Sequence, residues 1–409
     1  MPRNLVICSD GTGNTFAQQV SNVSHLVRAV DLADCDAQLV FYDQGIGTNP
    51  NLVKALQRFK DESGGQRKAL EVLEPPKVRL LRPLATLAGL TVGYGLSANL
   101  EEMYQALAKH YNPATDRIFL FGFSRGAFTV RALAGLLYRC GIPSSRFAKD
   151  SRAFHCCFAE AYAAYRPHCE DWVRIDRFKK TYEAVEVDIH FLGLWDTVKS
   201  YGGLLPRSLP HLRHNPIVRT VRHALALHER RSWFLPTSWG GIDGDADVRT
   251  PVRPDVRYML QSVDEVWFIG CHSDVGGGDD EAETAKISFR WMLGEATHAG
   301  LLLAPTCEEW IFAADDSDRP PRVNQSYNWR WWLSDRIPRW ELDNGRRPPG
   351  YPVRWQGHGA RCPENFRRHG HLQFHSTTGV TLKTGVTISH TRQRLTRAEV
   401  EAMHSGEPR

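Results

Sequence analysis

The sequence predicts an α/β protein in which a mainly parallel sheet is covered by helices on both faces. Two observations lead to this fold class. Short runs such as NLVIC at residues 4–8 and IFLF at residues 118–121 are almost wholly apolar, which is typical of strands buried on both faces. Segments with apolar residues at helical spacing alternate with these runs, which favours parallel strands joined by helical crossovers.

Each element follows from a local pattern. The helix over residues 23–32 can be capped at its N-terminus by Ser21 or Asn22, and the helix that ends near residue 140 is followed by Gly141 and Pro143, which stop it. We expect strands at residues 4–8, 38–42, 118–121, 187–194 and 263–269, and helices at residues 23–32, 99–111, 126–140 and 285–293.

Composition excludes several classes of protein. The 409 residues are 42% hydrophobic and 24% charged, which disfavours disorder and fibrous repeats, and the net charge of +5 is too small to indicate nucleic-acid binding. Nine cysteines without a CxxC pair indicate reduced thiols rather than a disulfide framework or a zinc ribbon. The N-terminus lacks the apolar run of a signal peptide, and residues 84–96 are too short to span a membrane. We expect a protein that is cytoplasmic as synthesised, a state also compatible with export that needs no signal peptide.

The strongest local motif is GFSRG, which places Ser124 between a predicted strand and a predicted helix. Glycines two residues on either side of a serine allow a tight strand-to-helix turn that exposes the hydroxyl, while the N–H groups of the helix N-terminus can bind an oxyanion. Ser124 is therefore a candidate nucleophile. The alternative is a turn in which Ser124 only caps the helix.

A nucleophilic serine needs a base and an orienting carboxylate, which in this architecture follow it in chain order at strand ends. Asp196 ends the run HFLGLWD, and His272 follows the run VWFIGC and precedes a glycine cluster. The order Ser124, Asp196, His272 is that of an α/β-hydrolase. Asp274 is a rival or supporting carboxylate. Five other histidines lie in predicted element bodies and are expected to be packing or surface residues: His25, His110, His190, His223 and His228.

The loop SDGTGN follows the first strand. Backbone N–H groups of Gly11 or Thr12 can join that of Arg125 as an oxyanion hole, and Asp10 can stiffen the loop. Cys8 stands where an aspartyl-phosphate phosphatase needs its nucleophilic aspartate, and the GxxxxGK[ST] pattern of a P-loop is absent. A plain glycine-rich turn remains the alternative.

Composition changes near residue 315. Five of the twelve tryptophans lie within residues 329–355, and eleven arginines lie within residues 319–368. We expect an α/β-hydrolase domain at 1–314, with 51–92 as a lid or insertion, and a C-terminal elaboration at 315–409 packed on it. Its Trp and Arg side chains suit a lipid headgroup boundary, or else packing and a solvated face.

Several stretches together resemble a family of α/β hydrolases, long labelled as a domain of unknown function, that includes type VI secretion phospholipase effectors of the first lipase class. They are LVICSDGTGNT, FYDQGIGT, GYGLSANLEEMYQAL, IFLFGFSRGAFTVRALAGLL, FLGLWDTV, WFIGCHSDVGGG and, more loosely, NQSYNWRWWLSDRIPR. The resemblance implies the α/β-hydrolase fold, ester hydrolysis, which in the effector members acts on phospholipids, and a triad at Ser124, Asp196 and His272.

These patterns predict a serine hydrolase that cleaves carboxylic esters and that requires no metal or organic cofactor. The resemblance implies phospholipid or other lipid acyl esters as its substrate. Its expected partners are a lipid or small ester, a membrane surface and a secretion-system or immunity protein, but not nucleic acid. Two alternatives stay open: a catalytically inactive interaction protein that keeps the fold, and a serine peptidase on the same fold.

Overall fold

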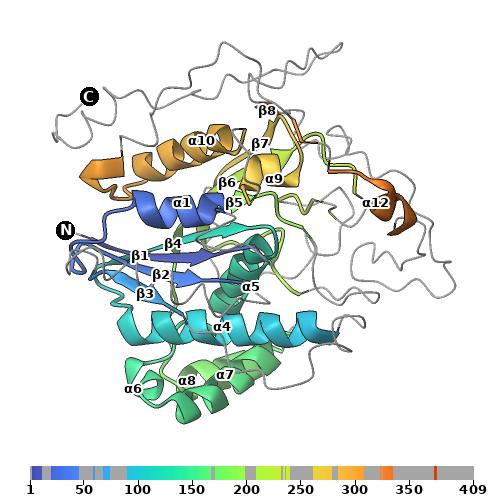
Figure 1. Ribbon diagram of the computed structural model, residues 1–409. Helices are drawn as coiled ribbons and strands as arrows, with labels where there is room; N and C mark the ends of the chain where they lie inside the picture. The colour runs from blue at the N-terminus through green and yellow to red at the C-terminus, as the bar shows by residue number, and fades with distance from the viewer. Residues whose placement is uncertain are drawn as a thin grey trace, which may run out of the picture.

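Eight parallel strands form one sheet in this computed structural model, in the order β3-β2-β1-β4-β5-β6-β7-β8 (Figure 1). All seven neighbouring pairs are parallel. The strands are β1 (Arg3–Ser9), β2 (Gln38–Asp43), β3 (Leu70–Val72), β4 (Asp116–Phe123), β5 (Ile189–Trp195), β6 (Val218–Ala226), β7 (Ser262–Phe268) and β8 (Gln373–Phe374). The structure describes residues 2–11, 20–45, 59, 68–73, 90–166, 171–198, 209–231, 234, 236–239, 261–278, 284–307, 323–324, 326–334 and 373–374.

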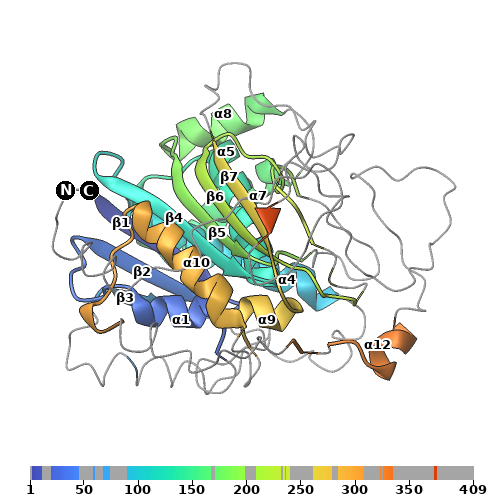
Figure 2. The ribbon, with the colours of Figure 1, turned by 90° about the horizontal axis from the view of Figure 1, so that it is seen from above.

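Helices cover both faces of the sheet (Figures 1 and 2). They are α1 (Asn22–Ala29), α4 (Leu90–His110), α5 (Arg125–Cys140), α6 (Ser145–Ala148), α7 (Ser151–Tyr165), α8 (Trp172–Thr181), α9 (His272–Gly276), α10 (Ala285–His298), the 3₁₀ helix η2 (Pro305–Cys307) and α12 (Trp329–Ser334). α1 and α10 lie on one face, and α4 to α8 lie on the other. None of the described helices combines the length and the apolar character needed to cross a membrane.

Central strands are buried on both faces, and their side chains divide between two hydrophobic cores. In β1, Leu5 and Ile7 pack into the core formed with α4, α5, α7 and α8, whereas Val6 and Cys8 pack into the core formed with α1 and α10. Because successive side chains of a strand point to opposite faces, a strand covered on both sides must be apolar at every position. This explains the continuous NLVIC run.

The order of the strands reverses between β1 and β4. The chain moves outward from β1 through β2 to β3, then returns to place β4 on the other side of β1. Loops that leave the carboxyl ends of β1 and β4 therefore diverge, and a parallel sheet binds its ligands at such a switch point. Ser9 at the end of β1 is in register with Gly122 of β4, so the loop after Ser9 and the GFSRG turn meet there.

The predicted α/β architecture is confirmed, and the five predicted strands correspond to β1, β2, β4, β5 and β7. Ser21 caps α1 by accepting a hydrogen bond from the Ser24 N–H, and Gly141 ends α5 with a φ of 68°. α4 begins at Leu90, nine residues before the predicted start. The prediction lacks the strands β3, β6 and β8, and it also lacks the helices α7 and α8.

Part of the segment expected as a lid or insertion belongs to the sheet. Within residues 51–92, Leu70–Val72 pairs with β2 as strand β3, and α4 starts at Leu90. Residues 51–58, 60–67 and 74–89 lie outside the described part of the chain. In the expected C-terminal elaboration, Gln373–Phe374 pairs with β7. The division at residue 314 stays a prediction.

Candidate active site

Ser124 is the single residue between β4 and α5. Its backbone has φ 58° and ψ −118°, a left-handed conformation that costs an ordinary L-residue about 1–3 kcal/mol. The Ser124 N–H donates to the Trp195 carbonyl of β5 at 3.0 Å, which fixes the turn against the neighbouring strand. This strained turn holds the hydroxyl at the carboxyl edge of the sheet.

The glycines of GFSRG are needed because neighbouring backbone leaves no room for a side chain. A Cβ at Gly122 would lie 2.6 Å from the Cα and N atoms of Ala127 in α5. A Cβ at Gly126 would overlap the carbonyl group of Ser9, at the end of β1. The two glycines thus permit α5 to start directly against β1 and β4. This is the tight strand-to-helix turn that the GFSRG motif predicts.

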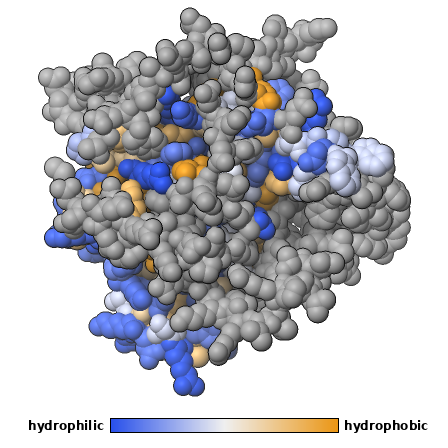
Figure 3. Space-filling view, viewed as in Figure 1, coloured by the Kyte–Doolittle hydropathy of each residue, from blue (hydrophilic) through white to orange (hydrophobic). Residues whose placement is uncertain are grey.

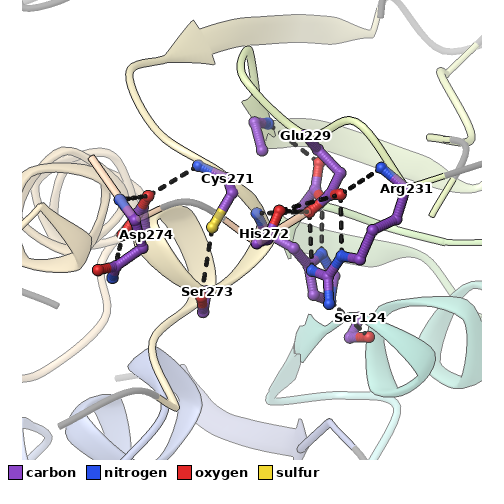
Figure 4. A network of polar contacts seen from close by, with 11 residues as sticks. Ser124, Glu229, Arg231, Cys271, His272, Ser273 and Asp274 are labelled. Atoms are coloured by element: carbon purple, nitrogen blue, oxygen red, sulfur yellow. Dashed lines mark hydrogen bonds and ion pairs between the residues drawn. The ribbon is translucent and has the colours of Figure 1, made fainter. Parts of the chain in front are cut away.

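His272 begins α9, just beyond β7, and lies between Ser124 and Asp196. Its Nε2 atom is 2.8 Å from Ser124 Oγ, and its Nδ1 atom is 2.6 Å from Asp196 Oδ2. When the carboxylate is ionised it only accepts hydrogen bonds, so Nδ1 carries the proton and Nε2 accepts from the serine hydroxyl. Figure 4 shows His272 directed toward Ser124. The structure therefore brings the three residues of the predicted triad together.

Two phenylalanines flank the imidazole of His272. The ring of Phe123 lies 4.7 Å from it, centroid to centroid, and the ring of Phe234 lies edge-on at 4.9 Å. His272 is 6% exposed, Ser124 is 7% exposed and Asp196 is fully buried. Because water is largely excluded, the hydrogen bonds within this triad act in a low-dielectric environment.

Asp196 directly follows β5 and also has a positive φ, 40°. Backbone bonds to β6 hold this turn: the Asp196 N–H donates to the Ala224 carbonyl at 2.8 Å, and the Ala226 N–H donates to Asp196 Oδ1 at 3.0 Å. The second oxygen of the carboxylate is thereby left for His272. Asp196, and not Asp274, is the carboxylate that contacts the imidazole.

A histidine–glutamate pair on β6 and β7 supports the residue after Asp196. The Thr197 N–H donates to His223 Nε2 at 3.2 Å, so the proton of His223 lies on Nδ1 and is shared with Glu265 at 2.8 Å. Burial lowers the pKa of His223 and opposes its protonation. The sequence pattern predicts that His223 is a packing or surface residue. In the structure, His223 holds the backbone next to Asp196 by accepting the hydrogen bond from Thr197.

Glu229 lies beside the catalytic histidine and is absent from the sequence prediction. Its Oε2 atom accepts from the His272 N–H at 3.2 Å, and its carboxylate pairs with Arg231 through bonds of 2.9 and 2.7 Å (Figure 4). The only sequence signal is the charged run HERR, which follows a strand that the pattern does not reveal. His228, expected in an element body, lies in this loop and accepts from the Gly270 N–H at 2.9 Å.

The residues predicted for the oxyanion hole have different outcomes. Arg125 is the first residue of α5, where a helix leaves its N–H groups without an intrahelical acceptor. The Gly11 N–H donates to Asp10 Oδ1 at 2.6 Å, so it is engaged within its own loop. Thr12 lies outside the described residues. Burial lowers the pKa of the Arg125 guanidinium to about 10, which leaves it protonated at neutral pH.

The two supporting aspartates both organise loops. Asp10 Oδ2 accepts from the hydroxyl groups of Ser21, Ser24 and Tyr42 at 2.6–2.9 Å. Asp274 accepts from the Cys271 N–H at 2.8 Å and from Asn324, whose backbone N–H is 3.0 Å away and whose side-chain amide is 2.7 Å away. Among the residues that the structure describes, no three His, Cys, Asp or Glu side chains form a metal-binding group.

Comparisons with known proteins identify a family that matches most of the chain. Residues 3–295 match a family model described as the catalytic domain of Tle1-like phospholipase effectors of the type VI secretion system. The uncharacterised yeast protein YEL023C of Saccharomyces cerevisiae is 31% identical over 237 residues, which are 57% of this chain but only 32% of that protein.

Two solved structures show a distant likeness. An uncharacterised protein from Pseudomonas aeruginosa is 19% identical with a TM-score of 0.39, covering 75% of this chain and 48% of that one. A Tle1 effector bound to the VgrG spike is 17% identical with a TM-score of 0.32, covering 69% of this chain and 52% of that one. The chain thus spans about half the length of each of these proteins or less.

Proposed function

The chain belongs to the family of Tle1-like phospholipase effector catalytic domains, and on this premise we propose that it is a serine hydrolase that cleaves acyl esters of phospholipids. The observation that carries the proposal is the hydrogen-bonded series Ser124, His272 and Asp196, with distances of 2.8 and 2.6 Å. Such a series activates a serine hydroxyl that is otherwise a weak nucleophile.

The proposed reaction has two halves. His272 Nε2 takes the proton of Ser124 as Oγ attacks the acyl carbon, and Asp196 stabilises the resulting imidazolium through Nδ1–H. The Arg125 N–H donates to the oxyanion, together with a second donor for which the loop after β1 is the candidate. The tetrahedral intermediate then breaks the ester bond, and His272 protonates the departing alcohol. In the second half, His272 deprotonates a water molecule that attacks the acyl-enzyme and releases the fatty acid.

Two features support a phospholipid as substrate. The family is described by phospholipase activity. The protonated Arg125 side chain belongs to the residue next to the nucleophile, where a guanidinium suits a phosphodiester. Transient contact with a membrane surface is part of this proposal, because phospholipids are presented in bilayers. A secretion-system or immunity partner, and export without a signal peptide, are further parts of it that follow from the family alone.

Labelling with a fluorophosphonate tests the nucleophile separately from the substrate. We expect one adduct on the wild type, at Ser124, and none on Ser124→Ala. The exposed serine Ser145 provides a matched control, since Ser145→Ala should label like the wild type. An unlabelled wild type would indicate the inactive interaction protein. Labelling together with turnover of peptide anilides but not of esters would indicate the peptidase.

A further inference from the structure

Two successive backbone N–H groups at the start of α9 are each bound by a carboxylate. The Cys271 N–H donates to Asp274 Oδ2 at 2.8 Å. The His272 N–H donates to Glu229 Oε2 at 3.2 Å. In Figure 4, Asp274 lies on one side of His272 and Glu229 lies on the other. Because the first N–H groups of a helix have no acceptor within the helix, these two carboxylates hold the backbone that carries the imidazole.

Both carboxylates are in turn bound by residues from the C-terminal part of the chain. Asn324 donates to Asp274 twice, from its backbone N–H at 3.0 Å and from its side-chain amide at 2.7 Å. The Ser326 hydroxyl lies 3.4 Å from both oxygens of Glu229. Asn324 and Ser326 lie beyond residues 3–295, which the family model matches. Residues outside the matched region therefore contact each support of α9.

Glu229 is a buried carboxylate, 1% exposed, whose position is closely fixed. It accepts from three N–H groups of Arg231: the backbone N–H at 2.7 Å, Nε at 2.9 Å and Nη2 at 2.7 Å. A buried carboxylate is costly unless it is paired and hydrogen-bonded, and these bonds supply both. The proposed ester chemistry does not use this carboxylate, because Asp196 already orients the imidazole. Glu229 therefore calls for a role of its own.

The ring of His272 is supported by a series of side chains. Phe234 lies edge-on to the imidazole at 4.9 Å between ring centroids, and Trp331 of α12 lies edge-on to Phe234 at 5.6 Å. The Arg231 guanidinium lies 3.7 Å from the centre of the Phe234 ring and 5.2 Å from that of Trp331. Arg231 thus links the support of the ring to Glu229, the support of the backbone.

Three residues, Asn324, Ser326 and Trp331, form a strap across the supports of His272. We propose that Glu229 is a positioning residue, which together with this strap holds the imidazole of His272 within the triad. The active site then includes a segment beyond residue 295. This inference rests on the proposed function, since it concerns the base of that reaction.

The physical reason lies in the two bonds that the imidazole has to make at once. Nε2 is 2.8 Å from Ser124 Oγ and Nδ1 is 2.6 Å from Asp196 Oδ2. A misplacement of about 1 Å can lower the rate on the order of a hundredfold. Loss of a support of His272 should therefore lower kcat and leave the binding of substrate almost unchanged.

The test compares Glu229→Ala and Glu229→Gln with Trp331→Ala and Trp331→Phe in the full chain. The amide oxygen of glutamine can still accept from the His272 N–H, and phenylalanine keeps an aromatic ring against Phe234. Glu186→Ala is the matched control, because Glu186 precedes β5 at the amino edge of the sheet and its side chain is 78% exposed.

Trp331 allows a test that does not depend on a buried charge. α12 lies at the periphery of the molecule in Figure 1, and in Figure 3 side chains of intermediate hydropathy project at the same edge. Trp331 belongs to neither of the two hydrophobic cores of the described residues, so its replacement leaves both cores intact. If Glu229→Ala does not fold, the two variants of Trp331 decide the outcome.

Three quantities are measured for each variant. They are kcat and KM on p-nitrophenyl butyrate, the rate constant of fluorophosphonate labelling at Ser124, and the urea midpoint of unfolding. The labelling rate reports on the triad without a lipid substrate, and the urea midpoint separates a loss of rate from a loss of fold.

We expect Glu229→Ala to lower kcat and the labelling rate by roughly ten- to a hundredfold, with KM within about threefold of the wild type. Glu229→Gln should recover most of this loss. Trp331→Ala should lower both rates by about three- to tenfold, since it acts through one more ring, and Trp331→Phe should restore them. Glu186→Ala should match the wild type.

Wild-type rates in Glu229→Ala would overturn the proposal, as would a loss that glutamine does not recover. A loss confined to KM would also overturn it and assign Glu229 to contact with the substrate. If Glu229→Ala does not fold, wild-type rates in Trp331→Ala would overturn the proposal instead.

Failure of the proposed function gives a different result. A wild type that neither hydrolyses the ester nor reacts with the fluorophosphonate would refute that function, and the positioning role with it. A wild type that does both but releases no fatty acid from phospholipid vesicles would refute only the lipid substrate. The rates of the Glu229 and Trp331 variants would then still decide the positioning role.

Discussion

Two residues of the site, Ser124 and Asp196, hold backbone conformations that L-residues seldom adopt, with φ of 58° and 40°. Each is fixed by hydrogen bonds to the next strand, Ser124 to Trp195 and Asp196 to Ala224. Such strain persists only when surrounding contacts impose it, and here it directs both side chains toward His272. The positions of the two groups therefore depend on the order of β4, β5 and β6 in the sheet.

Replacing Asp196 and Asp274 one at a time separates their roles. Asp196→Asn should lower kcat on a soluble ester by roughly 10³–10⁴-fold, because an amide no longer fixes the proton on His272 Nδ1. Asp274→Asn removes a loop contact and should lower kcat by less than about tenfold. Steady-state kinetics of both variants provide the measurement, and a larger loss in the Asp274 variant would contradict the assignment.

His223 is a positioning residue in this account, since it acts on Asp196 through Thr197. His223→Ala should lower kcat by roughly ten- to a hundredfold with KM little changed, because the carboxylate shifts relative to the imidazole. His223→Gln can still accept from the Thr197 N–H and donate to Glu265, and should recover most of the rate. If kcat of the alanine variant equals that of the wild type, or if glutamine gives no recovery, His223 is only a packing residue.

At the scale of elements, the sequence pattern predicts the strands that are apolar throughout. It does not predict β6, VRTVRHALA, in which polar and charged residues interrupt the apolar ones. The polar residues of β6 are tolerated because they have charged partners on α10 and β7. Arg222 contacts Glu295 of α10 at 2.6 Å and Asp264 of β7 at 3.3 Å, and His223 contacts Glu265 of β7. These partners are about 40 to 73 residues away in the chain, so no local pattern shows them. Because the sequence pattern does not predict β6, it also does not predict the roles of His223 and the Ala226 N–H on this strand, or of Glu229 in the loop after it.

The helix α1 introduces a sensitivity to acid. Burial against α10 lowers the pKa of His25 to about 4, below its ordinary value of 6.5. The unfolded chain therefore binds this proton first as the pH falls, and the stability contributed by neutral His25 is lost between pH 6.5 and 4. By this group alone the free energy of unfolding drops by on the order of 2–3 kcal/mol.

Asp43 has the opposite effect. Burial raises the pKa of its carboxyl group to about 6, so its contribution favours the folded state as the pH falls through 6 toward 3.8. His25→Gln should therefore flatten the decline in stability between pH 7 and pH 4.5, whereas Asp43→Asn should steepen it. Urea midpoints of the wild type and both variants across this range provide the measurement; the same slope in all three would contradict the assignment.

For the whole molecule, the sheet brings together residues that are 148 positions apart in the chain. Ser124, Asp196 and His272 follow β4, β5 and β7, and the parallel strands place these three loops at one edge. Chain order and strand ends were enough to predict the three residues. The predicted second oxyanion donor stays a prediction, because the Gly11 N–H donates to Asp10 and Thr12 lies outside the described residues. The contacts of Asn324 and Trp331 could not be predicted, because they come from a segment distant in sequence.

The most direct test of the central claim is release of fatty acid from phospholipid vesicles by the wild type and by Ser124→Ala. The account predicts release by the wild type and a loss of at least about 10⁴-fold in the variant, with folding unchanged by circular dichroism. Release that persists in Ser124→Ala would contradict the triad. Turnover of a soluble ester without any release from vesicles would keep the triad and contradict the lipid substrate.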